Sequence, residues 1–293
     1  MEEVHFPNSN LFSEAYTLED SGTLLLALNS KTGTESEQGI YRYHALKGKF
    51  RRILRYDADE VCYRVLSPKR GTYLLNMTTS NEIRVYQKGR IVQQIPLEGC
   101  PNDVCLNKDG TLCYIALNRA YPANAGMICE LNLSNFALRY LVGESSFGYT
   151  RAINARSLSL VSGIIYNEGH LYIATLVDVL KIRLSDLFAV SVIAKASDYA
   201  TLPNFDNITI HKRRLYVSIY NYDDALTHFV RSSPTLRTLH AIYWYAAGTV
   251  FDGNRKPDTI PMQTGSLVHY LQVDCEHCGE QKSCTFRPRS KWV

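Results

Sequence analysis

Apolar and polar residues alternate along most of the chain, and long stretches with the 3.6-residue period of a helix are scarce. Alternation with a period of two is typical of half-buried β-strands. One kind of unit recurs: a polar turn, an apolar strand that contains an aromatic residue, a short break and a second strand. Such units begin near residues 21, 70, 109, 168 and 211. The chain is therefore predicted to be all-β and built from repeats.

The units follow one another every ~45 residues, and about four short strands in that length are typical of a β-propeller blade. Five units are clear, and a sixth, degenerate one is predicted from residues 246–275. The apolar stretch at 4–7 is predicted to complete the last blade. We therefore predict a six-bladed β-propeller over 1–274 and a basic, cysteine-containing tail over 275–293. The alternative is two separate β-sandwiches, but no linker rich in Pro, Gly or Ser divides the chain.

Composition excludes few classes of protein. The net charge is +4, with Lys and Arg spread along the whole chain, so the concentrated basic face of a nucleic-acid binder is not expected. The sequence contains no run of about 18 apolar residues, so no membrane span is predicted. The polar N-terminus lacks the apolar core of a signal peptide, which predicts a cytoplasmic location.

The eight cysteines fall into two groups. Five are scattered through strand-like segments and are predicted to be small buried side chains. The other three, Cys275, Cys278 and Cys284, cluster in the tail around His277. Three Cys and one His are a zinc-ligand set, but the spacing lacks a second Cys-x-x-Cys or His-x-x-x-His pair. We predict a loosely packed tail without zinc.

Oxygen-bearing side chains recur where the first strand of a unit meets the predicted propeller axis. They are Glu14 in the first unit, Asn102 and Asp103 in the third, Ser162 in the fourth, and Asp206 and Asn207 in the fifth. Carboxylate and amide oxygens are the ligands of a hard cation such as Ca²⁺. Asn-Asp pairs are also common turn residues, so one pair alone has a structural explanation. Their recurrence in separate units favours a metal site.

Three of these segments resemble one known group of proteins. They are SEAYTLEDSGTLLLALN, PNDVCLNKDGTLCYIAL and FDNITIHKRRLYVSIYN. They are similar to motifs of the six-bladed calcium-dependent propellers, which include the senescence-marker-protein/gluconolactonase group, the paraoxonases and the strictosidine-synthase-like proteins. The resemblance implies Ca²⁺ bound by Glu14, Asn102, Asp206 and Asn207. It also implies that Asp206 serves as a general base. A carboxylate bound to Ca²⁺ is a weakened base, so a second basic group nearby would help, and Asp103 is the candidate for that role.

The sequence departs from that group at several functional positions. Ser162 stands where the group has a calcium-binding asparagine, and a hydroxyl is a weaker ligand than an amide oxygen. Cys100 stands where the gluconolactonases have a sugar-contacting arginine. His44 is the nearest candidate for the catalytic histidine of paraoxonases, and it is interpreted as a surface residue at a strand end. The metal-binding positions are thus partly kept, and the substrate-binding ones are not recognisable.

Two functions from different classes follow. The first is a calcium-dependent hydrolase of a lactone or ester, in which the metal polarises the carbonyl oxygen. The second is a non-catalytic propeller that binds a ligand or a protein partner, with the Tyr-rich stretches YNYDDALTHF and HAIYWYAAG as recognition surfaces.

Overall fold

The computed structural model is all-β. It describes residues 6–7, 10–13, 15–19, 23–31, 33, 36–44, 47–119, 125–143, 152–195, 204–211, 214–220, 267–274, 285–286 and 289–292. Only the backbone is described for residues 204, 206, 211, 214, 216, 218–220, 267–274, 285–286 and 289–292. These ranges contain no α-helix, and in them we find no helix of the length and apolar character needed to span a membrane.

The strands of the described ranges form five antiparallel sheets. The first contains β1 (Leu11–Phe12), β2 (Tyr16–Glu19), β3 (Thr23–Ser30), β4 (Gly39–His44) and β5 (Lys49–Leu54). The second contains β6 (Cys62–Lys69), β7 (Thr72–Met77), β8 (Glu82–Gln87) and β9 (Arg90–Pro96). The third contains β10 (Cys100–Leu106), β11 (Leu112–Asn118), β12 (Gly126–Asn132) and β13 (Leu138–Gly143).

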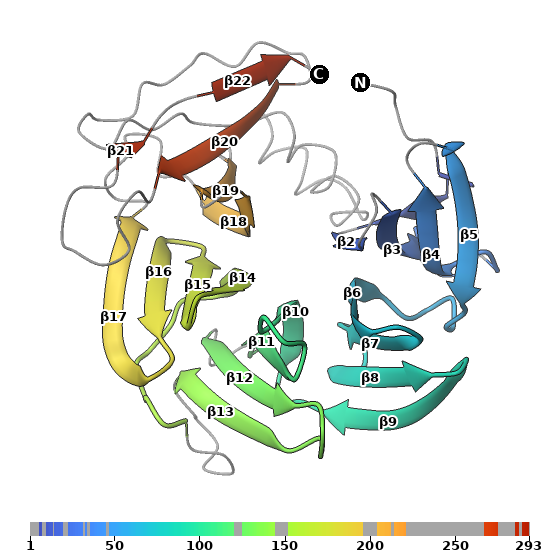
Figure 1. Ribbon diagram of the computed structural model, residues 1–293, viewed down its shortest axis with the longest axis horizontal. Coiled ribbons are helices and arrows are strands. Elements are labelled where there is room, and N and C mark those ends of the chain that lie inside the picture. Colours follow the sequence, from blue (N-terminus) through green and yellow to red (C-terminus); the bar gives the residue numbers. More distant parts are fainter. Residues whose placement is uncertain are drawn as a thin grey trace.

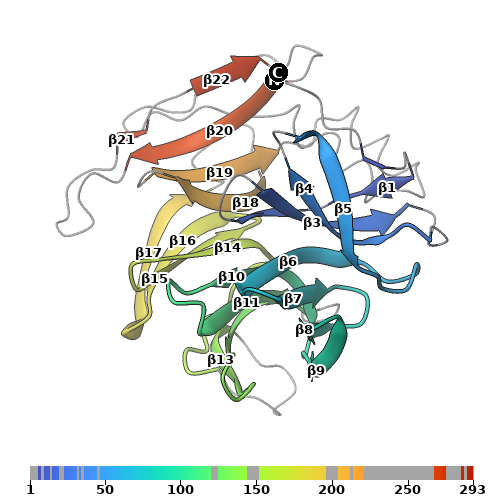
Figure 2. The ribbon, with the colours of Figure 1, turned by 45° about the vertical axis from the view of Figure 1, so that its right-hand side comes forward.

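The fourth sheet contains β14 (Val161–Asn167), β15 (His170–Thr175), β16 (Asp178–Arg183) and β17 (Asp186–Lys195). The fifth contains β18 (Asn204–His211), β19 (Arg214–Tyr220), β20 (Leu267–Asp274), β21 (Thr285–Phe286) and β22 (Arg289–Trp292). Figure 1 shows the five sheets arranged around one centre, with β2, β6, β10, β14 and β18 nearest to it. From the first sheet to the fifth, each innermost strand contacts that of the following sheet: β2 contacts β6, β6 contacts β10, β10 contacts β14 and β14 contacts β18. Figure 2 shows the first sheet lying beside the second, as neighbouring blades do.

Two of the hairpin turns show how the sequence sets the strand register. Lys88 and Gly89 join β8 to β9 with φ angles of 51° and 78°, and Glu168 and Gly169 join β14 to β15 with φ angles of 46° and 75°. Positive φ at both loop residues matches the twist of the flanking strands. Glycine at the second position adopts this conformation without steric cost. The predicted turn at residues 88–89 is confirmed.

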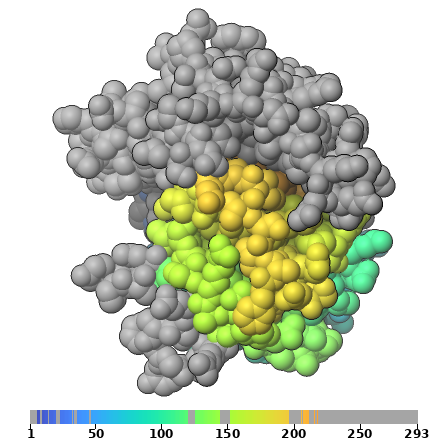
Figure 3. All heavy atoms as spheres, turned by 90° about the vertical axis from the view of Figure 1, so that its left-hand side faces the viewer, coloured from blue at the N-terminus to red at the C-terminus, as the bar shows by residue number. Residues whose placement is uncertain are grey.

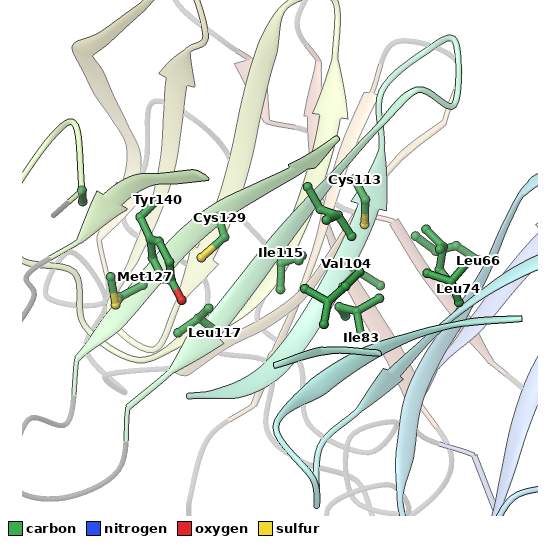
Figure 4. Packing of buried hydrophobic residues seen from close by; sticks show 14 residues of the cluster. Leu66, Leu74, Ile83, Val104, Cys113, Ile115, Leu117, Met127, Cys129 and Tyr140 are labelled. Carbon is green, nitrogen blue, oxygen red and sulfur yellow. The ribbon is translucent and has the colours of Figure 1, made fainter. Parts of the chain in front are cut away.

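The core lies between neighbouring sheets. One cluster of buried apolar side chains joins the second sheet to the third. Figure 4 labels ten of its members, which come from β6, β7 and β8 on one side and from β10 to β13 on the other. Equivalent clusters join the first sheet to the second, the third to the fourth and the fourth to the fifth. Both faces of the middle blades are therefore buried, which explains why strands such as β7 and β11 are buried along almost their whole length.

Two details of the predicted ring differ from the structure. β20 pairs with β19, with Val217 opposite Leu271, so residues 267–274 belong to the fifth sheet and do not form part of a separate sixth one. The long stretch between the two strands hid this pairing, because a repeat is recognised from regular spacing. Phe6, the described apolar residue of the stretch at 4–7, packs on Phe50 of the first sheet. The predicted tail contributes β21 and β22, which both pair with β20. The three cysteines and His277 of the tail lie outside the described residues.

Candidate functional site at the propeller axis

The predicted axis positions lie at matching bulges of the innermost strands. The register shifts between Pro101 and Asp103 in β10, between Val161 and Gly163 in β14, and between Phe205 and Ile208 in β18. The bulges contain Asn102, Ser162, and the pair Asp206–Asn207, respectively. A β-bulge bends the strand and redirects its side chains. The structure thus brings these positions to equivalent places around the centre of the ring.

The second sheet has the same bulge, which the sequence comparison missed. β6 shifts register between Cys62 and Val65, so Tyr63 and Arg64 occupy the bulge. In the first sheet Phe12 lies opposite Asn29 and Tyr16 opposite Leu26. Glu14 falls between these two pairs in the chain, and it lies outside the described residues, as does the side chain of Asp206.

Asp103 is buried and fully engaged. Its side chain is 1% exposed. Oδ1 accepts a hydrogen bond of 2.9 Å from the backbone N–H of Val104, and Oδ2 accepts one of 3.0 Å from that of Ile164 in the fourth sheet. Nε of Arg64 lies 2.6 Å from Oδ1. Burial raises the pKa of Asp103, and the charge of Arg64 together with the two N–H groups opposes that rise.

Arg64 reaches across the centre of the ring. Besides its ion pair with Asp103, Nη1 donates to the backbone oxygen of Tyr16 at 3.2 Å, and Nη2 donates to Oδ1 of Asn207 at 3.4 Å. Burial is the largest single effect and lowers the pKa of Arg64, but the charge of Asp103, the contact with its carboxylate and the nearby Tyr63 together outweigh it, so the pKa is raised and the guanidinium stays positive. One side chain thus contacts the innermost strands of the first, third and fifth sheets.

Asn102 and Ser162 hold neighbouring blades together. Nδ2 of Asn102 donates to the backbone oxygens of Val161 and Ser162, at 3.0 and 3.2 Å. Oγ of Ser162 lies 2.9 Å from the backbone oxygen of Phe205 and 3.0 Å from that of Ala174. The hydroxyl hydrogen of Ser162 is therefore directed at carbonyl groups, and the side chain is 5% exposed.

Two further asparagines link blades and were not predicted. Asn118 donates from Nδ2 to the oxygen of Val161 at 2.8 Å and accepts from its N–H at 2.7 Å. Asn29 makes the same pair of bonds, both 2.9 Å, to the oxygen and the N–H of Cys62. Each asparagine thus fixes the first residue of the next innermost strand. The signal in the sequence was the repeated tripeptide Ala-Leu-Asn, at 27–29 and at 116–118.

The described side chains fit a bound calcium poorly. A guanidinium already lies beside the carboxylate of Asp103 and the amide oxygen of Asn207. Asn102 and Ser162 direct donor groups at backbone oxygens. Within the described residues no group of three His, Cys, Asp or Glu side chains is placed to hold a metal. The polar groups that the sequence predicts as ligands are used, where described, in contacts between blades.

The remaining candidate residues lie away from a reactive site. Cys100 is half-buried, and its Sγ contacts the backbone oxygen of Thr78 at 3.5 Å. His44 is exposed at the end of β4, and its Nδ1 lies 3.1 Å from Oγ1 of Thr23, which confirms its interpretation as a surface residue at a strand end. Of the five cysteines predicted to be buried, four are buried with free thiols, and burial raises the pKa of each: Cys62, Cys105, Cys113 and Cys129. The prediction was wrong for the fifth, Cys100, which is half-buried.

Comparison with known proteins supports the fold. No family model matches the sequence, and no curated protein matches it. Among solved structures, streptogramin B lyase, a β-propeller, aligns with a TM-score of 0.50 at 11% identity, over 98% of this chain and 84% of that one. This likeness concerns the fold alone. With the radial arrangement of the five sheets, it identifies the chain as a β-propeller.

Two structures of unknown function align less well. One, from Bacteroides caccae, has a TM-score of 0.45 at 15% identity, over 64% of this chain and 68% of that one. The other, from Desulfotomaculum acetoxidans, has a TM-score of 0.46 at 16% identity, over 69% of this chain and 66% of that one.

Proposed function

We propose that this chain is a non-catalytic β-propeller that serves as a binding platform for protein partners. The observation that carries the proposal is the use of the polar side chains at the axis. Asn102, Asp103 and Ser162 are all bonded to the backbone of the next blade. A catalytic metal needs ligand oxygens that face it and a coordination position left for substrate. The contacts described here favour a structural joint between blades.

The recognition surfaces follow from the sequence. The Tyr-rich stretches at 220–229 and 240–248 lie almost entirely outside the described residues, and their assignment rests on composition. Tyr and Trp are enriched among the residues that dominate binding energy at protein interfaces. Trp244 in the second stretch is therefore the first residue to test. Replacing Trp244 by Ala is expected to reduce the recovery of specific partners in quantitative affinity purification.

A calcium-dependent hydrolase of a lactone or ester is the second candidate. The matching bulge positions of Asn102, Ser162 and Asn207 favour it, because they are three of the predicted metal ligands. In this hypothesis Ca²⁺ would be held with the help of Glu14 and Asp206, and it would polarise the carbonyl group of the substrate. Asp206 would act as the base. Asp103 suits a second basic role poorly, because both of its oxygens already accept hydrogen bonds.

One assay separates the two functions. Purified protein is incubated with a panel of lactones and aryl esters, in Ca²⁺, Mn²⁺, Zn²⁺ or EGTA, with Asp206→Asn as the matched variant. The binding-platform proposal predicts no turnover under any condition. Turnover that disappears both in EGTA and in Asp206→Asn would establish the hydrolase in its place.

We also propose that the ring has six blades, as the repeat length predicts. β2 is the innermost strand of the first sheet, yet Tyr16 is 59% exposed and Leu18 is 66% exposed. The described part of the ring therefore leaves apolar surface on the first blade open. A sixth blade from residues 221–266, which are about one repeat long, would cover that surface. A crystal structure would count the blades, and Tyr16 exposed to solvent in a closed five-bladed ring would refute the proposal.

A further inference from the structure

Three oxygen atoms from three different blades surround the guanidinium of Arg64. They are a carboxylate oxygen of Asp103 at 2.6 Å, the backbone oxygen of Tyr16 at 3.2 Å, and the amide oxygen of Asn207 at 3.4 Å. The three belong to β10, β2 and β18. The charged group therefore lies where the innermost strands of the first, third and fifth sheets converge.

A carboxylate, an amide oxygen and a backbone carbonyl are the kinds of ligand that Ca²⁺ takes in proteins. Arginine offers those oxygens five N–H donors and a permanent positive charge. A metal ion bound by the same oxygens would lie within a few ångströms of the guanidinium, where two positive charges repel strongly in a buried setting. The arginine and the calcium ion are thus alternatives at this place.

We propose that Arg64 is the resident cation of the propeller axis and takes the place of the calcium ion that the sequence motifs imply. Its positive charge compensates the buried carboxylate of Asp103 and ties together strands that are far apart in sequence. The wild-type protein is then stable without divalent metal. The inference goes beyond the binding function, and it holds whatever partner the chain binds.

The first test is metal dependence. The melting temperature of the wild-type protein is measured in EGTA and in millimolar Ca²⁺ or Mg²⁺. We expect no shift, because the axis oxygens are already neutralised by the arginine. A ligand present far above its dissociation constant must stabilise the fold, so a rise of several degrees in Ca²⁺ that is reversed by EGTA would overturn the proposal.

The second test asks whether the charge of Arg64 matters, and not only its bulk. Arg64→Met keeps much of the volume and removes the charge, whereas Arg64→Lys keeps the charge. Breaking a buried ion pair leaves an uncompensated charge, so we expect Arg64→Met to raise the unfolding equilibrium constant by about 100-fold or more. Arg64→Lys is expected to raise it clearly less. Equal losses in the two variants would overturn the proposal.

The third test places both substitutions in an Asp103→Asn background, which removes the buried negative charge. In that background the charge at position 64 no longer has a buried carboxylate to pair with. The Arg64→Met and Arg64→Lys variants are therefore expected to differ by less than about threefold in their unfolding equilibrium constants, because the effects of two residues that interact directly are not additive. Arg139→Met is the matched control. Arg139 is 60% exposed and pairs with Glu130 at 2.7 Å, so its loss is expected to change the constant by less than about fivefold.

If Arg64→Met does not fold, the comparison of Arg64→Lys with and without Asp103→Asn still decides the question. An unchanged penalty of Arg64→Lys in the Asp103→Asn background would show that Asp103 is not the partner and would overturn the proposal. Hydrolase activity without added metal would refute the proposed binding function and leave this inference intact. The two proposals therefore fail by different outcomes.

Discussion

Asn76 allows a sharp test of how the blades are packed. This residue lies in β7 with 0% of its surface exposed, and neither its Nδ2 nor its Oδ1 has a hydrogen-bond partner among the described residues. It lies opposite the bulge of β6. The residues opposite the corresponding bulges of the third and fourth sheets are Ala116 and Ala174. Because Leu74, two residues earlier, packs between the second and third sheets, Asn76 faces the same interface. An amide is thus buried where the neighbouring blades have a methyl group.

We predict that Asn76→Ala stabilises the protein. Leaving a buried polar group without a partner costs about 1–3 kcal/mol, and the substitution removes that cost. The shorter side chain leaves a small cavity, and at ~24 cal/mol per Å³ a void of about 30 Å³ costs ~0.7 kcal/mol. The expected net gain in the free energy of unfolding is about 0.5–2 kcal/mol. Urea denaturation measures it, with an unchanged m-value as evidence that the unfolding transition is otherwise the same.

Asn29→Ala is the matched control. Asn29 is also 0% exposed and also lies on the second strand of its blade, but it bonds both the N–H and the oxygen of Cys62 at 2.9 Å and accepts from the hydroxyl of Tyr56 at 2.7 Å. Its replacement is expected to cost ~2–3 kcal/mol, because it leaves buried backbone groups without partners. The two alanine variants should therefore change stability in opposite directions. A loss in Asn76→Ala as large as in Asn29→Ala would refute the reasoning and indicate that Asn76 binds a buried water.

Three further predictions concern the contacts between blades. Asn118→Ala is expected to lower the free energy of unfolding by ~2 kcal/mol in urea titrations, because it breaks both bonds to the backbone of Val161; an effect below about 0.5 kcal/mol would contradict the linking role. Gly126→Ala is expected to cost about 1–3 kcal/mol in the same measurement, since an added Cβ would clash with the side chain of Val161 and the carbonyl of Ser159; a neutral result would show that these groups move apart easily. The thiol of Cys113, which is 0% exposed and has a pKa raised by burial, should resist a thiol reagent until the chain unfolds, as followed by mass spectrometry of its peptide; rapid native-state labelling would indicate local opening.

Local features of this fold were predictable from the sequence. The two-residue alternation and the polar turns predict strands and hairpins, because these depend on neighbours in the chain. The turn at Lys88 and Gly89 is an example. Comparing repeats also aligned Asn102 with Ser162 and Asp103 with Asn207, and the structure places these residues at the corresponding bulges of β10, β14 and β18.

The chemistry at the axis was not predictable in the same way. Arg64 contributes through partners on three other blades, and Asn207 is 143 residues away in the chain. The sequence comparison left out the first strand of the second unit, so an arginine at the bulge went unseen. Asp103 was expected to act as a base, but Arg64 and two backbone N–H groups engage both of its oxygens. Such roles depend on which side chains meet across the ring, and repeat spacing does not contain that information.

The cross-axis reach of Arg64 has a consequence for folding. In a repeat protein whose units contact only their neighbours, stability is nearly a sum of unit and nearest-neighbour terms, and the end units fray first. Each blade here forms mainly from consecutive strands, which close short loops at little entropic cost. The contact between Arg64 and Asn207 requires the second and fifth blades to be in place together, so it forms late. Once formed, this contact couples the second and fifth blades. Unfolding of the chain is then expected to be cooperative, as in a single domain, and not to proceed blade by blade from the ends.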